Sequence, residues 1–223
     1  MSTVNKSFTL NHKKYHNAMI KKHPIIIGVG PAGCGKTHIA CQEGLNKLMT
    51  NEVKRLIITR PAISVDESHG FLPGSLKEKM APYMCPIYES FLESISQRQL
   101  NKFIEEKQIE VSPFAFMRGR TFKDAFVIAD ESQNITKNQM KNLLTRIGDG
   151  SQLVITGDLT QSDLIHVDGS IKENGLYDIM KRCERQFEHR DECLIDIIQF
   201  TNADILRSDI LHQVLELYDQ SFV

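Results

Sequence analysis

One short segment constrains the fold of this chain more than any other feature. Gly30–Thr37 reads Gly-Pro-Ala-Gly-Cys-Gly-Lys-Thr and matches the pattern GxxxxGK[ST] at every fixed position. It follows the apolar run Ile25–Val29 and precedes a stretch with a helical pattern. The glycines permit a tight loop whose N–H groups point at phosphate oxygens, and the N-terminus of the next helix adds partial positive charge. The segment therefore predicts a phosphate-binding loop, and a glycine-rich turn that matches by accident is the weaker interpretation.

This loop assigns roles to individual side chains. Lys36 is expected to reach the β- and γ-phosphates of a nucleoside triphosphate, and the Thr37 hydroxyl to bind Mg²⁺. The full set of predicted nucleotide contacts here is Gly30, Pro31, Ala32, Gly33, Cys34, Gly35, Lys36, Thr37 and His38.

A second predicted part of the site is a pair of acids at the end of another apolar run. Ala125–Ala129 is followed directly by Asp130 and Glu131. Asp130 is expected to hold Mg²⁺ through water, and Glu131 to orient and deprotonate the attacking water. Two acids that merely cap the following helix are the alternative. The neighbouring glutamate favours hydrolysis over a small-molecule kinase reaction.

A third polar group follows the run Leu153–Thr156. The next residues are Gly157-Asp-Leu-Thr-Gln161, and a polar residue at such a strand end senses the γ-phosphate in P-loop ATPases. The candidates, in order of preference, are Gln161, Asp158 and Thr156.

Short apolar runs alternate with helical patterns along the chain. Because most runs are continuously apolar, they are typical of parallel strands covered on both faces. The helices have capping boxes at Thr136–Gln139 and Ser75–Glu78. The pattern predicts an α/β fold in one domain. The expected strands are Pro24–Val29, Arg55–Thr59, Ile109–Ser112, Ala125–Ala129, Leu153–Thr156 and Leu194–Phe200.

Some finer predictions concern single elements. The helix after Thr136 is expected to include Ile147 and to stop at Gly148 and Gly150. A helix over residues 9–22 is expected to pack on the core through Tyr15, Met19 and Ile20. The proline-rich excursion Arg60–Pro86 is expected to be ordered, because it also carries Phe71, Leu72, Met80 and Tyr83.

Composition excludes several classes of protein. No apolar run is long enough to span a bilayer, and the N-terminus lacks a signal-peptide core. The five cysteines are scattered, and Cys183–His189–Cys193 lacks the paired spacing of a zinc site. We therefore expect a cytoplasmic protein with reduced thiols. The net charge of −1 gives no overall attraction to nucleic acid.

Six stretches of the sequence closely resemble the PhoH-like family of P-loop ATPases. The excursion after Arg60 and the Met117–Thr121 stretch are more diagnostic than the phosphate-binding loop, and the resemblance covers about Thr9 to Tyr218. The matching stretches are Gly30–Thr37, Thr59-Arg-Pro-Ala62, Gly70-Phe-Leu-Pro-Gly74, Met117-Arg-Gly-Arg-Thr121, Ala125–Asn134 and Thr156–Gln161.

The resemblance implies a single RecA-like P-loop domain over residues 1–223, with a mostly parallel sheet and helices on both faces. It also implies ATP and Mg²⁺ as ligands and a relation to superfamily 1 helicases. Some members carry a PIN nuclease domain, for which this chain has no room. His12 stands near the place where the family usually has a base-reading glutamine, so adenine selectivity is less certain than phosphate binding. Cys34 replaces a common threonine, with little expected consequence.

Such a core usually needs an arginine at the transition-state γ-phosphoryl group. Superfamily 1 helicases supply it from a second domain, so a neighbouring subunit is expected to supply it here. The expected assembly is a homo-oligomer, with a hexameric ring as its candidate form. The candidates are Arg118, Arg120 and Arg207, with Arg60 behind them.

Two functions remain open at the level of sequence. One is Mg²⁺-dependent ATP hydrolysis coupled to RNA or single-stranded nucleic acid, and the other is an ATP-dependent switch with little turnover. Nucleic acid would meet a basic segment around Arg118 and Arg120, with Phe114 and Phe116 stacking on bases, although buried aromatics are the default interpretation. A lysine group near the N-terminus, with a solvated helix face as its default, consists of Lys13, Lys14, Lys21 and Lys22.

Overall fold

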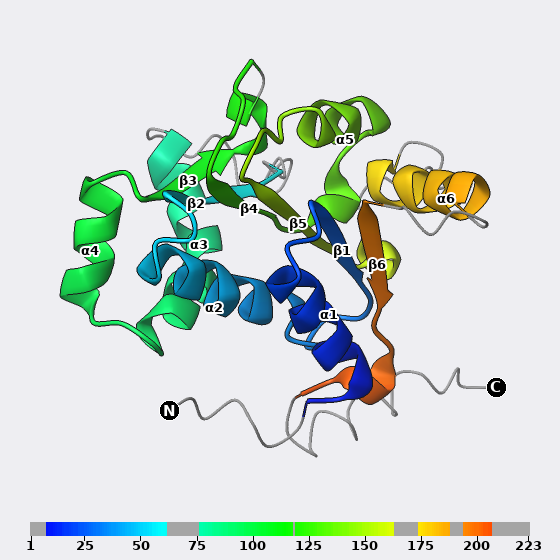
Figure 1. Ribbon diagram of the computed structural model, residues 1–223, viewed down its shortest axis with the longest axis horizontal. Coiled ribbons are helices and arrows are strands. Elements are labelled where there is room, and N and C mark those ends of the chain that lie inside the picture. Colours follow the sequence, from blue (N-terminus) through cyan, green and yellow to red (C-terminus); the bar gives the residue numbers. More distant parts are fainter. Residues whose placement is uncertain (1–7, 62–75, 118, 163–173, 188–193, 207–223) are drawn as a thin grey trace.

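The fold is built on one sheet of six parallel strands (Figure 1). We describe it from a computed structural model in residues 8–61, 76–117, 119–162, 174–187 and 194–206. The strand order is β3-β2-β4-β5-β1-β6. The strands are β1 (Ile25–Val29), β2 (Arg55–Arg60), β3 (Ile109–Pro113), β4 (Ala125–Ala129), β5 (Gln152–Gly157) and β6 (Ile195–Gln199). All six predicted strands are confirmed, with ends that differ by at most one residue.

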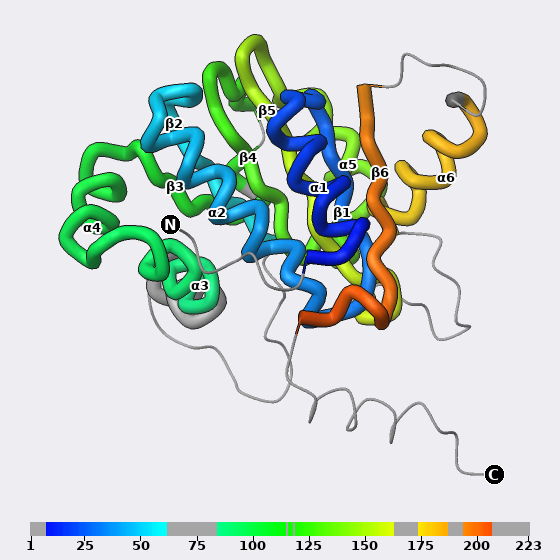
Figure 2. The backbone as a smooth tube through the Cα atoms, turned by 60° about the horizontal axis from the view of Figure 1, so that its bottom comes forward, coloured from blue at the N-terminus to red at the C-terminus, as the bar shows by residue number. Residues whose placement is uncertain are grey.

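Helices cover both faces of this sheet, so the predicted α/β class with a parallel sheet is confirmed. Successive strand residues point to opposite faces. Ile26 packs with α1 and α2, whereas Ile27 packs with α5 and α6. The first face is covered by α1 (Leu10–Ile20), α2 (Lys36–Met49), α3 (Leu76–Leu92) and α4 (Gln97–Glu105), and the second by α5 (Lys137–Leu144) and α6 (Gly175–Phe187) (Figure 2).

The end of α5 was predicted wrongly. The Thr136–Gln139 capping box forms as expected, but the helix stops at Leu144, short of Ile147. The Thr145 hydroxyl donates to the Lys141 and Asn142 carbonyls. Ile147 instead pairs with Phe122 in an isolated bridge, so its apolar character serves a contact outside the helix.

Helix α1 packs on the core through fewer residues than predicted. Tyr15 and Met19 are fully buried, whereas Ile20 is 51% exposed. The inward face of the helix is completed by His12 and Ala18, which lie one turn away from Tyr15. The prediction for Ile20 was wrong because the helix ends there and its last side chain turns outward.

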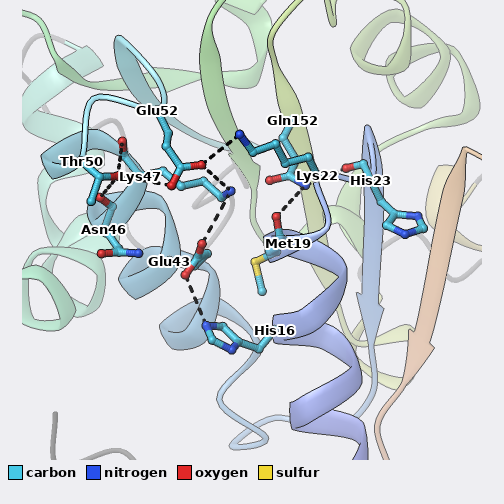
Figure 3. A network of polar contacts seen from close by, with 10 residues as sticks. All are labelled: His16, Met19, Lys22, His23, Glu43, Asn46, Lys47, Thr50, Glu52 and Gln152. Atoms are coloured by element: carbon cyan, nitrogen blue, oxygen red, sulfur yellow. Dashed lines mark hydrogen bonds and ion pairs between the residues drawn. The ribbon is translucent and has the colours of Figure 1, made fainter.

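A network of charged side chains fastens α1 to α2 (Figure 3). Glu43 and Lys47, one turn apart on α2, are almost fully buried, with Lys47 Nζ 3.6 Å from Glu43 Oε1. His16 of α1 lies 3.3 Å from Glu43 Oε2, and Lys47 also reaches Glu52 at 3.7 Å. Lys22 Nζ also contacts this network, at 3.2 Å from Glu52 Oε2.

Several predictions lie outside the described residues. They are the Ser75–Glu78 capping box, the side chains of Phe71, Leu72, Met80 and Tyr83, and His189 and Cys193. In the part of the chain that is described, no group of three or more His, Cys, Asp or Glu side chains is arranged to hold a metal ion. No helix among those residues combines the length and apolar character that a membrane span needs.

Candidate active site

A cleft of about 410 Å³ opens at the carboxyl ends of β1, β2, β4 and β5. Its size suits a small-molecule ligand. The acids after β4 form one wall and residues of α3 form another. The predicted phosphate loop contributes Ala32, Gly33, Gly35, Lys36, Thr37 and His38 to the lining.

The shape of the loop depends on glycine at three positions. Gly30, Gly33 and Gly35 have φ angles of 151°, 85° and 70°, which disfavour any residue with a Cβ. A Cβ on Gly30 would also lie 2.5 Å from the carbonyl oxygen of Phe200. Glycine therefore lets the loop pass directly beneath the segment that follows β6.

Lys36 lies inside the loop that precedes it. Its ammonium donates to the carbonyl oxygens of Gly30 and Pro31, both at 2.7 Å. Burial lowers the pKa of this ammonium, and nearby acids partly oppose that effect. The charge is thus fixed at the mouth of the loop, where a phosphate would bind.

The Asp130 carboxylate is the centre of the polar contacts in the cleft. Its Oδ1 accepts from the Thr37 hydroxyl at 2.7 Å and from the Thr156 hydroxyl at 2.5 Å. Its Oδ2 accepts from Arg60, through Nε at 2.7 Å and Nη2 at 2.6 Å. Thr156, the last of the three predicted sensors, is fully buried, and its contact is with this acid.

These contacts fit a Mg²⁺ site. The Thr37 hydroxyl gives its hydrogen to Asp130, which leaves its oxygen lone pairs for a cation in the cleft. A hydroxyl and a carboxylate are oxygen ligands of the kind that Mg²⁺ prefers. Thr37 and Asp130 are therefore the residues that would hold the ion, as the sequence predicts.

Glu131 has a strained backbone and a fixed side chain. Its φ of 55° is left-handed, which is uncommon outside glycine and is often found at functional sites. Gln133 donates to Glu131 Oε2 at 2.6 Å, and Arg60 Nη2 lies 3.5 Å from Oε1. The side chain is 39% exposed, so its carboxylate is held in place and still reaches solvent.

Gln133 was missed in the sequence although it organises this edge of the sheet. Its amide oxygen accepts from the Asp158 N–H at 3.1 Å, while its nitrogen holds Glu131. Asp158 caps the turn after β5 through Thr160, and the exposed Gln161 lines the cleft. The signal available was the position of Gln133 two residues after Glu131, within a stretch already matched to the family.

His12 lies behind the loop and is fully buried. Its Nε2 lies 2.9 Å from the Cys34 carbonyl oxygen, and its Nδ1 lies 2.8 Å from the Thr9 hydroxyl. Phe200 packs against the ring at 5.3 Å between centroids. With both nitrogens engaged by the protein, His12 braces the loop, and its predicted contact with the base has no support in this geometry.

The predicted arginines fall in different places. Arg60 is in the cleft, whereas Arg120 makes a bidentate ion pair with Glu110 on the edge strand β3. That pair lowers the pKa of Glu110. Since β3 is four strands from β1, the two strands lie roughly 19 Å apart across the sheet, and Arg120 does not line the cleft. Arg118 and Arg207 lie outside the described residues.

Helix α3 contributes polar groups beside the P-loop helix. His38 Nδ1 lies 3.1 Å from the Ser90 hydroxyl, and His38 Nε2 lies 3.7 Å from Glu93. These contacts join α3 to the first turn of α2, and all three residues line the cleft.

Comparison with solved structures gives only a low similarity. The Sulfolobus solfataricus SWI2/SNF2 ATPase core in complex with dsDNA has a TM-score of 0.47 and 16% identity, covering 88% of this chain and 44% of its own. Bacteroides Pif1 bound to ssDNA has a TM-score of 0.40 and 12% identity, covering 95% and 46%.

Comparison with known sequences is far more specific. A PhoH-like protein of Mycobacterium tuberculosis (strain ATCC 25618 / H37Rv) is 40% identical over 210 residues, covering 94% of this chain and 56% of its own length. The PhoH-like protein of Bacillus subtilis (strain 168) is 38% identical over 212 residues, covering 95% and 63%. Protein PhoH of Escherichia coli (strain K12) is 38% identical over 201 residues, covering 89% and 54%. The chain thus spans a little over half the length of these relatives.

The family profile described as "PhoH-like protein" matches residues 5–219. With that match over most of the sequence, and with the phosphate loop and acid pair meeting in one cleft, the chain belongs to the PhoH-like protein family.

Proposed function

We propose that this chain hydrolyses ATP with Mg²⁺. The observation that carries the proposal is the Thr37–Asp130 hydrogen bond at 2.7 Å, with Glu131 at the same cleft. It joins the phosphate loop to the acid strand in an arrangement that suits a metal-bound triphosphate. The neighbouring glutamate favours water as the acceptor of the phosphoryl group.

Different residues would bind the phosphates and activate the water. The loop N–H groups and Lys36 would hold the phosphates, and Glu131 would take a proton from the attacking water. The water oxygen forms a bond to the γ-phosphorus as the bond to the β–γ bridging oxygen breaks, and ADP leaves with that electron pair. Bound Mg²⁺ would neutralise charge on the β- and γ-phosphate oxygens.

Glu131→Gln tests this assignment. We expect phosphate release to fall by about 10²–10⁴-fold because the general base is lost, while ATP binding persists. Glu105→Gln on the exposed face of α4 is the control and should behave as wild type. Unchanged hydrolysis in Glu131→Gln would refute the proposed base. Wild-type protein that binds ATP without releasing phosphate would favour the alternative, a nucleotide-dependent switch.

We further propose that hydrolysis is coupled to RNA or single-stranded nucleic acid. Phe116 supports this proposal. Burial was the default expectation for this ring, but it is 57% exposed and lies just after the carboxyl end of β3. Its neighbour Phe114 is buried, so only Phe116 of the two is available to stack on a base. The basic residues of this region are Arg118, Arg120 and Lys123.

Binding to labelled single-stranded RNA at rising salt tests the coupling. We expect affinity to fall steeply with salt, because phosphate contacts release counterions. Phe116→Ala should weaken binding by about 1–3 kcal/mol if the ring stacks on a base. Phosphate release that RNA does not stimulate, together with salt-independent binding, would contradict the proposal.

We also propose that the active form is a homo-oligomer, with a hexameric ring as the expected closed assembly. The position of Arg120 supports it, since this arginine lies at the sheet edge opposite its own phosphate loop. Arg120 would reach a γ-phosphate only in another copy, and Arg118 and Arg207 are the other candidates. The mass of the protein in solution with ATP and Mg²⁺ tests the assembly, and a monomer under those conditions would exclude it.

A cytoplasmic location is proposed on the basis of the thiols. Among the described residues, Cys34, Cys41, Cys85 and Cys183 are all outside disulfides, as is usual in a reducing compartment. Fractionation of cells that express the protein tests this location.

A further inference from the structure

Arg60 occupies the position between the two acids of the cleft. It is the last residue of β2, and β2 lies beside β4 in the sheet. Two of its nitrogens donate to Asp130 Oδ2, and Nη2 also lies 3.5 Å from Glu131 Oε1. Its side chain is only 15% exposed. A single guanidinium is therefore the counter-ion of both carboxylates.

This arrangement places a protein cation where a metal cation is also expected. Asp130 is almost fully buried, and a buried carboxylate needs a positive partner. Arg60 and Mg²⁺ both satisfy that need, but two cations next to one carboxylate repel each other. Binding of the metal would thus weaken the hold of Asp130 on Arg60.

Once released from Asp130, the guanidinium would still be close to the reacting groups. Arg60 lines the same cleft as Lys36, Thr37 and Gln161. It lies beside Glu131, the proposed base, with Nη2 3.5 Å from Oε1. An arginine that faces the transferred phosphoryl group stabilises its transition-state charge.

We propose that Arg60 is a catalytic residue that acts within its own chain by exchanging partners. It holds Asp130 and Glu131, and it would turn its charge toward the γ-phosphoryl oxygens once Asp130 is engaged in holding Mg²⁺. This inference rests on the proposed ATP hydrolysis and leaves its bond changes as written above. Arg60 adds charge stabilisation and transfers no proton.

Arg60→Gln tests the exchange through two quantities, because it should strengthen Mg²⁺ binding while it slows turnover. The first is the Mg²⁺ concentration at which binding of fluorescently labelled ADP is half enhanced, and we expect it to fall about tenfold because a competing cation is gone. The second is kcat for phosphate release, which we expect to fall about 10²–10³-fold. A purely structural role would raise the Mg²⁺ midpoint as activity falls, and that result would overturn the proposal.

Two further variants separate charge from shape and position. Arg60→Lys keeps the charge without the two-nitrogen contact, and we expect it to restore part of kcat and to return the Mg²⁺ midpoint toward the wild-type value, because a competing cation is present again. Arg55→Gln, at the opposite end of the same strand, is the matched control and should leave both quantities unchanged. The same change in both quantities for Arg55→Gln would show a general effect of charge on β2 and would overturn the specific role of Arg60.

Mixing experiments decide whether Arg60 acts in its own chain. Arg60→Gln subunits mixed with Asp130→Asn subunits should remain inactive, because each chain then lacks one part of its own site. Recovery of activity in the mixture would show that Arg60 acts across subunits and would overturn the proposal. If wild-type protein releases no phosphate, the proposed hydrolysis fails instead, and the Mg²⁺ midpoint of Arg60→Gln still tests the exchange.

Discussion

Gly30 shows how much of the site depends on the absence of a single side chain. A Cβ at this position would lie 2.5 Å from the Phe200 carbonyl oxygen and 2.7 Å from the Phe200 Cβ. Its φ of 151° adds a backbone cost for any other residue. The loop therefore touches the segment after β6 with no space for even a methyl group.

Gly30→Ala should lower the free energy of unfolding by about 2–3 kcal/mol and weaken nucleotide binding, because backbone strain and a clash act together. Urea unfolding and titration with labelled ADP measure the two effects. Gly119→Ala is the control, since Gly119 also has a positive φ, of 80°, but its Cβ would meet nothing within 4 Å. Its expected cost is only about 1 kcal/mol. Equal losses in the two variants would show that backbone conformation alone matters.

At the scale of elements, the α1–α2 network holds a buried charge pair away from the cleft. Glu43 and Lys47 have side-chain exposures of 8% and 4%. A buried pair of this kind contributes little compared with an apolar pair, but loss of one partner leaves an uncompensated charge.

Lys47→Met should therefore cost about 3 kcal/mol in the free energy of unfolding. The double variant Glu43→Leu with Lys47→Met should recover much of that loss, which a double-mutant cycle by urea unfolding would measure. The exposed pair Lys102–Glu106 on α4 is the control, with an expected coupling of about 0.5 kcal/mol or less. Additive effects at Glu43 and Lys47 would contradict the pairing.

The elements themselves differ in how well the sequence predicts them. Most of the strands are found because they are continuously apolar, and the loop Gly30–Thr37 because its chemistry is local. The end of α5 is missed because the partner of Ile147 is Phe122, which is distant in the sequence. The contact of Arg60 with Asp130 is missed for the same reason. It depends on the pairing of β2 with β4, and the sequence of a strand does not show which other strand it pairs with.

At the scale of the whole molecule, Asp204 joins segments far apart in the sequence. Its carboxylate accepts hydrogen bonds from Thr9, Asn11 and Thr201. Leu206, two residues later, donates to the Gly33 carbonyl at 3.2 Å. The segment after β6 and the start of α1 thus meet behind the phosphate loop. Although burial opposes it, these hydrogen bonds hold the pKa of Asp204 below its ordinary value.

Asp204→Asn should lower the free energy of unfolding by about 2 kcal/mol near neutral pH, where the charged carboxylate makes these bonds. Because the folded-state pKa is depressed, the stabilisation is present above the unfolded-state value of about 3.9 and is lost as the pH falls through the lower folded value. The gap between wild type and variant should therefore stay constant from pH 5 to 8 and shrink below about pH 4. Urea unfolding across this range measures it, with the exposed Asp149→Asn as control. A gap that does not shrink in acid would contradict the assignment.

The strand order has a consequence for synthesis on the ribosome. β1, which leads into the phosphate loop, has only β5 and β6 as sheet neighbours, and both are made long after it. At ~5–20 residues per second, β1 waits on the order of 10 s for its partners. During that time its apolar residues are exposed and the loop has no fixed shape. The nascent chain should therefore gain affinity for nucleotide only late in translation, and stalled chains of increasing length should bind labelled ADP only after β6 has emerged.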